Sequence, residues 1–117
     1  MNRLVIALLG SVLYSGASMA QKQTYFTNPV IRGDVADPSI IRIDDTYYVT
    51  GTSSEWAPYY PVFTSKDLVN WKQTGHVFEQ QPEWTKSSFW APEWYYHNGK
   101  VYVYYTARKK SNNTSYI

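Results

Sequence analysis

Short runs of apolar and β-branched residues alternate with turn residues along the chain and divide it into pairs of strands. Ser39 to Ile43 and Thr46 to Gly51 are two such runs, separated by Asp44-Asp45. β-Branched and aromatic residues favour strands, and a pair of aspartates is typical of a turn. The pattern therefore predicts an antiparallel hairpin that begins directly after Asp37-Pro38.

The same pattern recurs later in the chain at a fixed offset. Pro38 and Tyr48 match Pro92 and Tyr102, and both offsets are 54 residues. Asn98-Gly99 falls on the first turn, and this dipeptide is a strong hairpin signal because both residues accept a positive φ. Strand pairs repeated at a period near 50 residues predict a β-propeller or another repeated all-β array.

The position directly before the shared proline is polar in the first copy only. Asp37 in the first copy corresponds to Ala91 in the second. The residues that the two copies share are interpreted as a structural framework, and the polar residue present in one copy only as functional. Asp37 is therefore the candidate functional residue. Pro38 is expected to hold Asp37 in extended geometry at the entrance of the strand, because proline restricts the residue before it.

The remaining runs complete one blade and begin a second. We expect two further strands, Tyr59 to Thr64 and Lys72 to Phe78, which give a four-stranded blade over residues 38–78. The polar segment 79–88 is interpreted as the crossing to the next blade, which is expected to begin at Phe89. A third strand of that second blade is expected to begin at Ser115.

The first 20 residues have the composition of a secretory signal. A basic start precedes the apolar run Leu4 to Tyr14, which is too short for a membrane span of about 20 residues. Ser18 and Ala20 are the small residues typical of a signal peptidase site. We therefore predict a signal peptide over residues 1–20 and a mature start at Gln21, with an ordinary apolar helix as the alternative. The protein is expected to be secreted or periplasmic.

Composition narrows the partners that the chain can have. Removal of the predicted signal peptide takes away Arg3, so the number of Lys and Arg residues falls from eleven to ten, against nine Asp and Glu. A nearly neutral chain predicts neither a nucleic-acid nor a membrane partner. The absence of cysteine excludes disulfides, and His76 and His97 stand alone without ligand spacing, so no metal site is predicted. Twelve Tyr and five Trp suit stacking on sugars, with strand packing as the alternative.

Three motifs in order resemble glycoside hydrolase family 43. They are Asp37-Pro38-Ser39-Ile40, the run from Ser65 to Trp71, and Trp90-Ala91-Pro92-Glu93. The resemblance covers roughly residues 27 to 110. It implies a five-bladed β-propeller, of which residues 21–117 would be a truncated N-terminal portion of about one and a half blades.

The resemblance also implies an activity. The family acts by an inverting mechanism on arabinosyl or xylosyl linkages of plant polysaccharides, and the sequence does not choose between the two sugars. Asp37 would be the general base that deprotonates water. Trp90 and Ala91 match positions that line the sugar pocket, and Trp56 is on a loop that would border it. No cofactor is implied, although some relatives hold a calcium ion for which this sequence offers no ligand.

The alternative is a propeller that only binds carbohydrate or a protein, with Asp37 as a strand cap. Inverting hydrolysis needs a protonated acid about 6.5–9.5 Å from the base. The family takes this Glu, and a second Asp that orients it, from later blades, and no other acid of the chain matches either motif. Sequence beyond Ile117 would therefore separate the two hypotheses.

This incomplete set of carboxylates gives a first prediction. The polypeptide 1–117 on its own is expected not to hydrolyse aryl arabinosides or xylosides, because it supplies a base without an acid. The measurement is release of the aryl group by the purified polypeptide, with its Asp37→Ala variant as the background. Turnover above that background would contradict the prediction.

Overall fold

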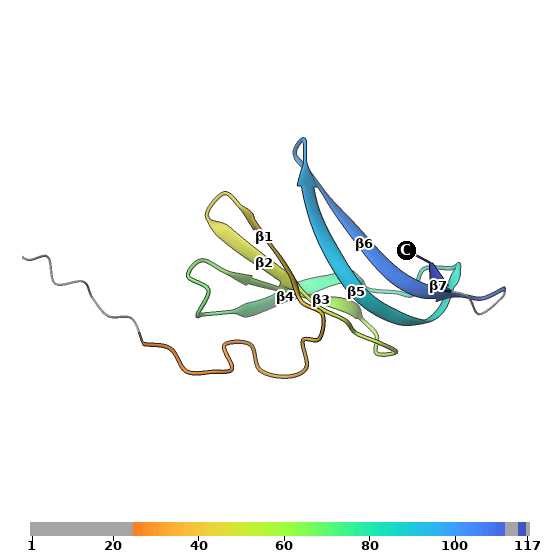
Figure 1. Ribbon diagram of the computed structural model, residues 1–117, viewed down its shortest axis with the longest axis horizontal. Coiled ribbons are helices and arrows are strands. Elements are labelled where there is room, and N and C mark those ends of the chain that lie inside the picture. Colours follow the sequence, from red (N-terminus) through yellow and green to blue (C-terminus); the bar gives the residue numbers. More distant parts are fainter. Residues whose placement is uncertain (1–24, 112–114, 117) are drawn as a thin grey trace, which may run out of the picture.

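A computed structural model describes residues 25–111 and 115–116, which form two antiparallel β-sheets (Figure 1). The strands are β1 (Ser39–Ile43), β2 (Thr46–Thr50), β3 (Tyr59–Ser65), β4 (Lys72–Phe78), β5 (Thr85–His97), β6 (Lys100–Lys109) and β7 (Ser115–Tyr116). The all-β prediction is confirmed for this part of the chain. It contains no helix that is long and apolar enough to cross a membrane. The predicted signal peptide, residues 1–20, lies outside the described residues.

The first sheet has the strand order β1-β2-β3-β4, and each strand is antiparallel to its neighbours. β1 and β2 form the predicted hairpin, in which Ile43 pairs with Thr46 across Asp44-Asp45. β3 and β4 lie where the sequence predicts them, although β3 continues one residue further, to Ser65. The predicted four-stranded blade is confirmed.

The second sheet has the order β5-β6-β7, and its first strand corrects one prediction. The crossing expected over residues 79–88 ends early, because β5 begins at Thr85 and pairs there with Lys109. Thr85 and Ser88 are buried although they are polar, and the ladder shifts register near them. The strand prediction relied on runs of apolar and β-branched residues, and the polar residues buried at this bulged end of β5 do not form such a run. The strand expected from Ser115 is confirmed as β7 over Ser115–Tyr116.

The repeat found in the sequence extends to the backbone. Asp44 and Asn98 occupy the same turn position and have φ values of +54° and +48°. Asp37 and Ala91 precede the two matching prolines and have φ values of +46° and +43°. Both hairpins therefore place a left-handed residue directly before Pro and another in the turn.

The extended geometry expected at Asp37 is therefore wrong, since its φ is +46°. Contacts from the end of the hairpin determine this conformation. The backbone N–H of Thr52 donates to the Ala36 carbonyl at 2.8 Å, and the Thr52 hydroxyl donates to the Asp37 carboxylate at 2.7 Å. These two hydrogen bonds outweigh the preference that Pro38 imposes, against a strain of about 1–3 kcal/mol.

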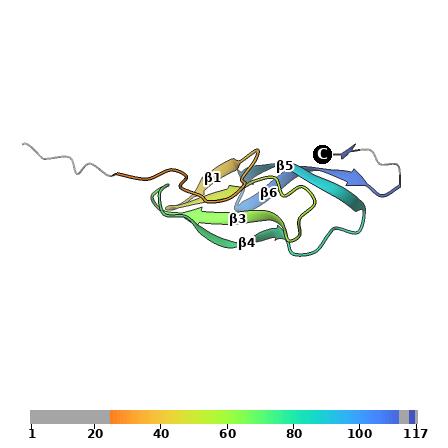
Figure 2. The same cartoon turned by 90° about the horizontal axis from the view of Figure 1, so that it is seen from below.

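The core lies between the two sheets and is aromatic. Tyr60 and Phe89 are fully buried, and the ring of Tyr59 stacks on Phe89 with 3.9 Å between the centroids. Phe78 and Tyr105 each contact Tyr60 edge to face. These rings come from β3 and β4 on one side and β5 and β6 on the other, so they join the two sheets (Figure 2).

Polar contacts reinforce this junction. The Tyr60 hydroxyl lies 3.3 Å from the Trp90 carbonyl oxygen and 3.1 Å from that of Thr106. Burial raises the pKa of Tyr60, so its hydroxyl stays a neutral donor at any physiological pH. At the far end of the junction the Trp94 backbone N–H donates to the Ser39 hydroxyl at 3.0 Å. The sheets are thus fixed to each other at several points.

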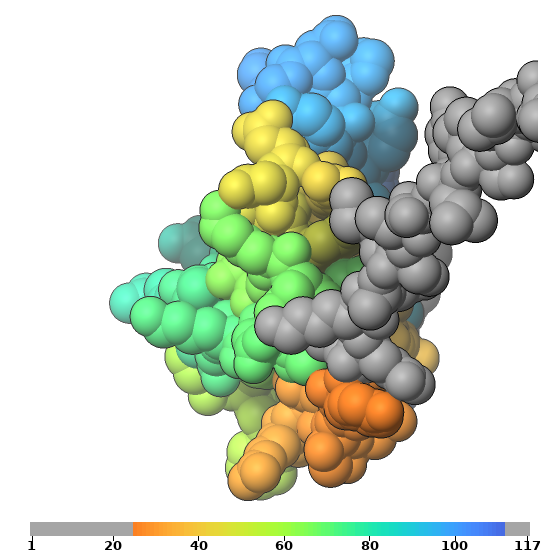
Figure 3. All heavy atoms as spheres, turned by 90° about the vertical axis from the view of Figure 1, so that its left-hand side faces the viewer, coloured from red at the N-terminus to blue at the C-terminus, as the bar shows by residue number. Residues whose placement is uncertain are grey.

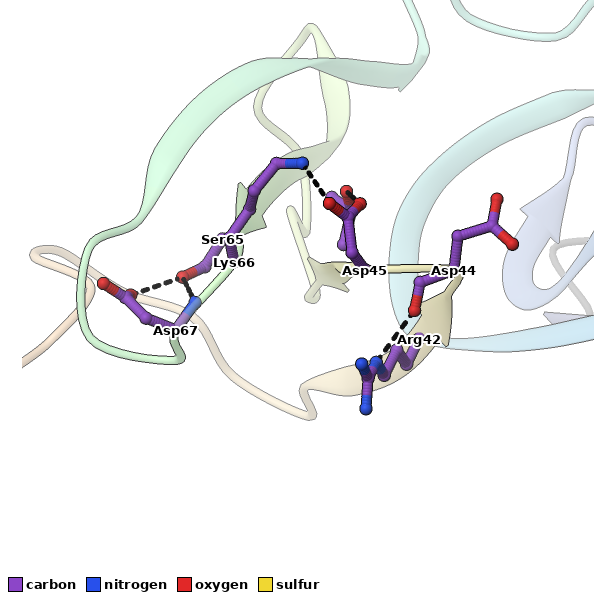
Figure 4. A network of polar contacts seen from close by, with 7 residues as sticks. Arg42, Asp44, Asp45, Ser65, Lys66 and Asp67 are labelled. Carbon is purple, nitrogen blue, oxygen red and sulfur yellow. Dashed lines mark hydrogen bonds and ion pairs between the residues drawn. The ribbon is translucent and has the colours of Figure 1, made fainter.

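The connection from β3 to β4 is built around Asp67, whose carboxylate accepts a hydrogen bond from the Ser65 hydroxyl at 3.0 Å (Figure 4). The carboxylate also accepts hydrogen bonds from the backbone N–H and the side-chain amide of Asn70, both at 2.7 Å, and from the Val69 N–H at 2.9 Å. These bonds hold the pKa of Asp67 well below its usual value. Lys66 pairs with Asp45 at 2.6 Å, but both side chains are exposed, so this pair adds little stability.

Gly51 stands where the lead-in segment passes the end of β2. A Cβ at this position would lie 2.9 Å from the Ala36 carbonyl oxygen and 2.9 Å from a methyl carbon of Val35. Only glycine fits so close an approach to backbone.

The lead-in that starts at residue 25, orange in Figure 3, lies at the opposite end of the molecule from the tip of the β5–β6 hairpin, in blue.

Gly51→Ala is expected to destabilise the intact protein. The added methyl group collides with the backbone of the lead-in, and overpacking of this kind typically costs about 1–3 kcal/mol. The measurement is the midpoint of urea unfolding. Gly75→Ala is the matched control, because a Cβ there meets nothing within 4 Å. Equal midpoints for the two variants would contradict the close approach.

Asp67→Ala is expected to lower the melting temperature at pH 7, and this effect is expected to shrink as the pH falls. The folded pKa is depressed, so the stability that Asp67 contributes is present above its ordinary pKa of 3.8 and is lost as pH falls through the folded value. Melting curves of parent and variant should therefore converge in acid. The exposed acid in Glu83→Ala is the control. A constant difference from pH 7 to pH 2 would exclude a role for the charge.

Candidate functional site

Asp37 lies at the open end of the first hairpin, two residues before β1, and its side chain is exposed. Ser39 pairs with Thr50 in the ladder, so the antiparallel register continued outward brings Asp37 opposite Thr52. The Thr52 hydroxyl donates to the Asp37 Oδ2 atom at 2.7 Å. The candidate base is therefore fixed through one of its two carboxylate oxygens.

Ala91 approaches the same hydroxyl from the second sheet. Its backbone N–H donates to the Thr52 Oγ1 atom at 2.8 Å. A hydroxyl can donate only one proton, and it can accept at the same time through its lone pairs. Thr52 therefore accepts from Ala91 and donates to Asp37, and it connects the two positions that the repeat makes equivalent.

The loop after Thr52 is attached to β5. Ser54 and Phe89 form an antiparallel bridge, in which the Phe89 N–H donates to the Ser54 carbonyl at 2.9 Å. The Glu55 carboxylate accepts from the Ser88 N–H through one oxygen and from the Ser88 hydroxyl through the other, both at 3.0 Å. Both oxygens of Glu55 are thus bound to β5, which gives this acid a structural role.

The two tryptophans of the site are both accessible. Trp56 is 80% exposed and lines a cavity of about 340 Å³ together with Thr52 and His76. Trp90 is 37% exposed, and the Arg108 guanidinium lies 5.6 Å from its ring centroid. A larger cavity of about 590 Å³ lies under the lead-in segment, but its lining is mostly apolar and does not include Asp37.

The structure thus brings part of the predicted site together. Asp37 and Ala91 meet at Thr52, Trp56 shares a cavity with Thr52, and Trp90 directly precedes Ala91. The sequence reasoning missed Thr52. The signal was present, since a polar residue just past the second strand of a hairpin lies opposite the residue just before the first strand.

The described residues offer no support for a metal ion. No group of three or more His, Cys, Asp or Glu side chains gathers within residues 25–111. A calcium ion like that of some relatives would therefore have to take its ligands from groups other than such a cluster.

Comparison with known proteins gives the site its context. The profile of Glycosyl hydrolases family 43 matches residues 26–117. A non-reducing end alpha-L-arabinofuranosidase of Bacteroides ovatus is 39% identical over 86% of this chain and 20% of its own length. An extracellular exo-alpha-(1->5)-L-arabinofuranosidase of Cellvibrio japonicus is 36% identical over 72% of this chain and 25% of its own.

A solved structure agrees with these sequences. The xylan beta-1,4-xylosidase of Bacillus halodurans superposes with a TM-score of 0.66 at 31% identity and covers 75% of this chain and 18% of that one. The chain thus spans about a fifth to a quarter of the length of the relatives it matches. The family fold is a five-bladed β-propeller, and the two sheets described above are a part of it. The chain belongs to glycoside hydrolase family 43.

Proposed function

We propose that the chain is the N-terminal portion of an exported glycoside hydrolase that cleaves arabinosyl or xylosyl linkages of plant polysaccharides with inversion. The observation that carries the proposal is the placement of Asp37, exposed at the mouth of a hairpin and held through one oxygen by Thr52. Membership of the family supports the reaction class, and the chain's short coverage of its relatives supports a longer protein.

In this proposal Asp37 is the general base. Its Oδ2 atom accepts the hydrogen bond from Thr52, which leaves the other carboxylate oxygen to accept a proton from water. The water oxygen forms a bond to the anomeric carbon while the glycosidic bond breaks. The leaving oxygen takes its proton from an acid about 6.5–9.5 Å from the base, which another part of the enzyme supplies.

The remaining site residues would bind the substrate. Trp56 and Trp90 are accessible indole rings, and flat amphipathic rings suit stacking against a sugar face. The backbone N–H of Ala91 contacts the Thr52 hydroxyl, and its side chain is small, so this residue would leave room for the sugar next to the base. These roles follow from the family resemblance and from exposure.

The names of the relatives guide the choice of substrate and compartment. They include arabinofuranosidases and a xylan beta-1,4-xylosidase, which supports pentose-containing polysaccharides as the substrate class. One of these relatives is named as extracellular, which fits the predicted signal peptide over residues 1–20 and a mature chain from Gln21.

Asp37→Asn in the complete enzyme is expected to lower kcat by about 10²–10⁴-fold and to leave KM largely unchanged. Asparagine keeps the size and most of the hydrogen bonding of aspartate but cannot accept the proton of water. The measurement is steady-state kinetics on an aryl arabinoside and an aryl xyloside, with a thermal melt of each variant.

Asp44→Asn is the matched control for this test. Asp44 is exposed and left-handed like Asp37, but it lies in the hairpin turn, and the second hairpin has Asn98 at the equivalent position. The control should keep its kcat. A folded Asp37→Asn enzyme with most of its activity would refute the general base and leave Asp37 as a strand cap in a binding protein.

A further inference from the structure

We propose that Thr52 is a positioning residue that aims the carboxylate of the general base and is itself held by the second sheet. The inference rests on the proposed role of Asp37 and goes beyond it. Thr52 is the one described side chain with a hydrogen bond to the Asp37 carboxylate, at 2.7 Å. It also contacts the backbone of the second sheet, through Ala91 at 2.8 Å.

The direction of these bonds follows from proton counting. The Ala91 backbone N–H can only donate, so it occupies a lone pair of the Thr52 hydroxyl oxygen. The single hydroxyl proton is therefore available to the Asp37 Oδ2 atom. A carboxylate that accepts this hydrogen bond on one oxygen cannot rotate freely about its Cβ–Cγ bond. The other oxygen then points in one direction, where a water molecule can be deprotonated.

The backbone on both sides of the hydroxyl is held firmly. Thr52 also donates its own N–H to the Ala36 carbonyl at 2.8 Å, so it is tied to both residues of the Ala36-Asp37 pair. On the other side, the Tyr60 hydroxyl binds the carbonyl of Trp90, the residue before Ala91, and Ala91 has a left-handed φ of +43°. Strained backbone that tertiary contacts maintain is characteristic of functional sites.

The arrangement gives a function to the junction of the sheets. Asp37 belongs to the first hairpin, but its orientation is set by a chain of contacts that ends on β5. A displacement of reacting groups by about 1 Å can cost about 100-fold in rate. Loss of the Thr52 hydroxyl should therefore lower kcat without a matching change in KM, since the substrate is bound by other side chains.

The test uses the complete enzyme and four substitutions. Thr52→Val keeps the shape of threonine but removes the hydroxyl, and it is expected to lower kcat by about 10–100-fold. Thr52→Ser keeps the hydroxyl and is expected to retain most of the activity. Thr52→Ala differs from the serine variant by a single oxygen and is expected to lose activity as Thr52→Val does. Thr46→Val is the matched control, because Thr46 donates to the exposed Asp45 carboxylate at 3.0 Å in the distant hairpin turn.

A double-mutant cycle separates positioning from a merely structural role. If Thr52 acts through the base, Thr52→Val has no further effect on kcat in an Asp37→Asn background. A residue that acts only on stability would lower the melting temperature and would leave the kcat of the folded enzyme unchanged in both backgrounds. Kinetics are measured well below each melting temperature, so that only folded enzyme is compared.

The outcomes are distinct for the two proposals. Equal kcat values for Thr52→Ser and Thr52→Ala, or independent effects in the cycle, would overturn the positioning role while a large effect of Asp37→Asn keeps the base. If Thr52→Val does not fold, the comparison of serine with alanine decides in its place. An Asp37→Asn enzyme with normal kcat would overturn both proposals.

Discussion

The burial of Phe89 between the two sheets is the contact on which the rest of the structure depends. Its ring is fully buried against Tyr59, and its backbone forms hydrogen bonds in both directions with the loop at Ser53 and Ser54. Apolar burial supplies the free energy, and the backbone bonds supply the register. Because Trp90 and Ala91 follow directly, the position of Phe89 brings these two residues to the open end of the first hairpin.

Much of the fold could be predicted because its signals are local. The turns at Asp44-Asp45 and Asn98-Gly99 and the runs of strand-forming residues in β1 to β4 depend on neighbours along the chain, and the repeat at 54 residues shows the same local pattern twice. The start of β5 could not be predicted, since Thr85 and Ser88 are polar residues that are buried, with their hydroxyls bound to the Pro82 carbonyl and to the Glu55 carboxylate. The same limit explains the φ of Asp37, where the bonds from Thr52 outweigh the preference before Pro38.

The same distinction between local signals and tertiary contacts applies to the residues of the candidate site. Asp37, Trp56, Trp90 and Ala91 could be named because motifs mark them, and their roles stay predictions that the kinetic experiments address. Thr52 belongs to no motif, and its importance comes from two contacts made by side chain and backbone across space. Glu55 shows the converse case. An acid beside an exposed tryptophan invites a chemical role, but both of its oxygens are occupied by Ser88.

The two hydrogen bonds at the Thr52 hydroxyl differ in the sequence separation of their partners. The bond to Asp37 spans 15 residues, within one hairpin, whereas the bond from Ala91 spans 39 residues. Contacts of low sequence separation form early, and a chain made on the ribosome presents its N-terminal segments first. The first hairpin can therefore form its ladder as it emerges, with the carboxylate already beside the hydroxyl. The bond from Ala91 to that hydroxyl requires the second hairpin, so we expect the two bonds to form one after the other.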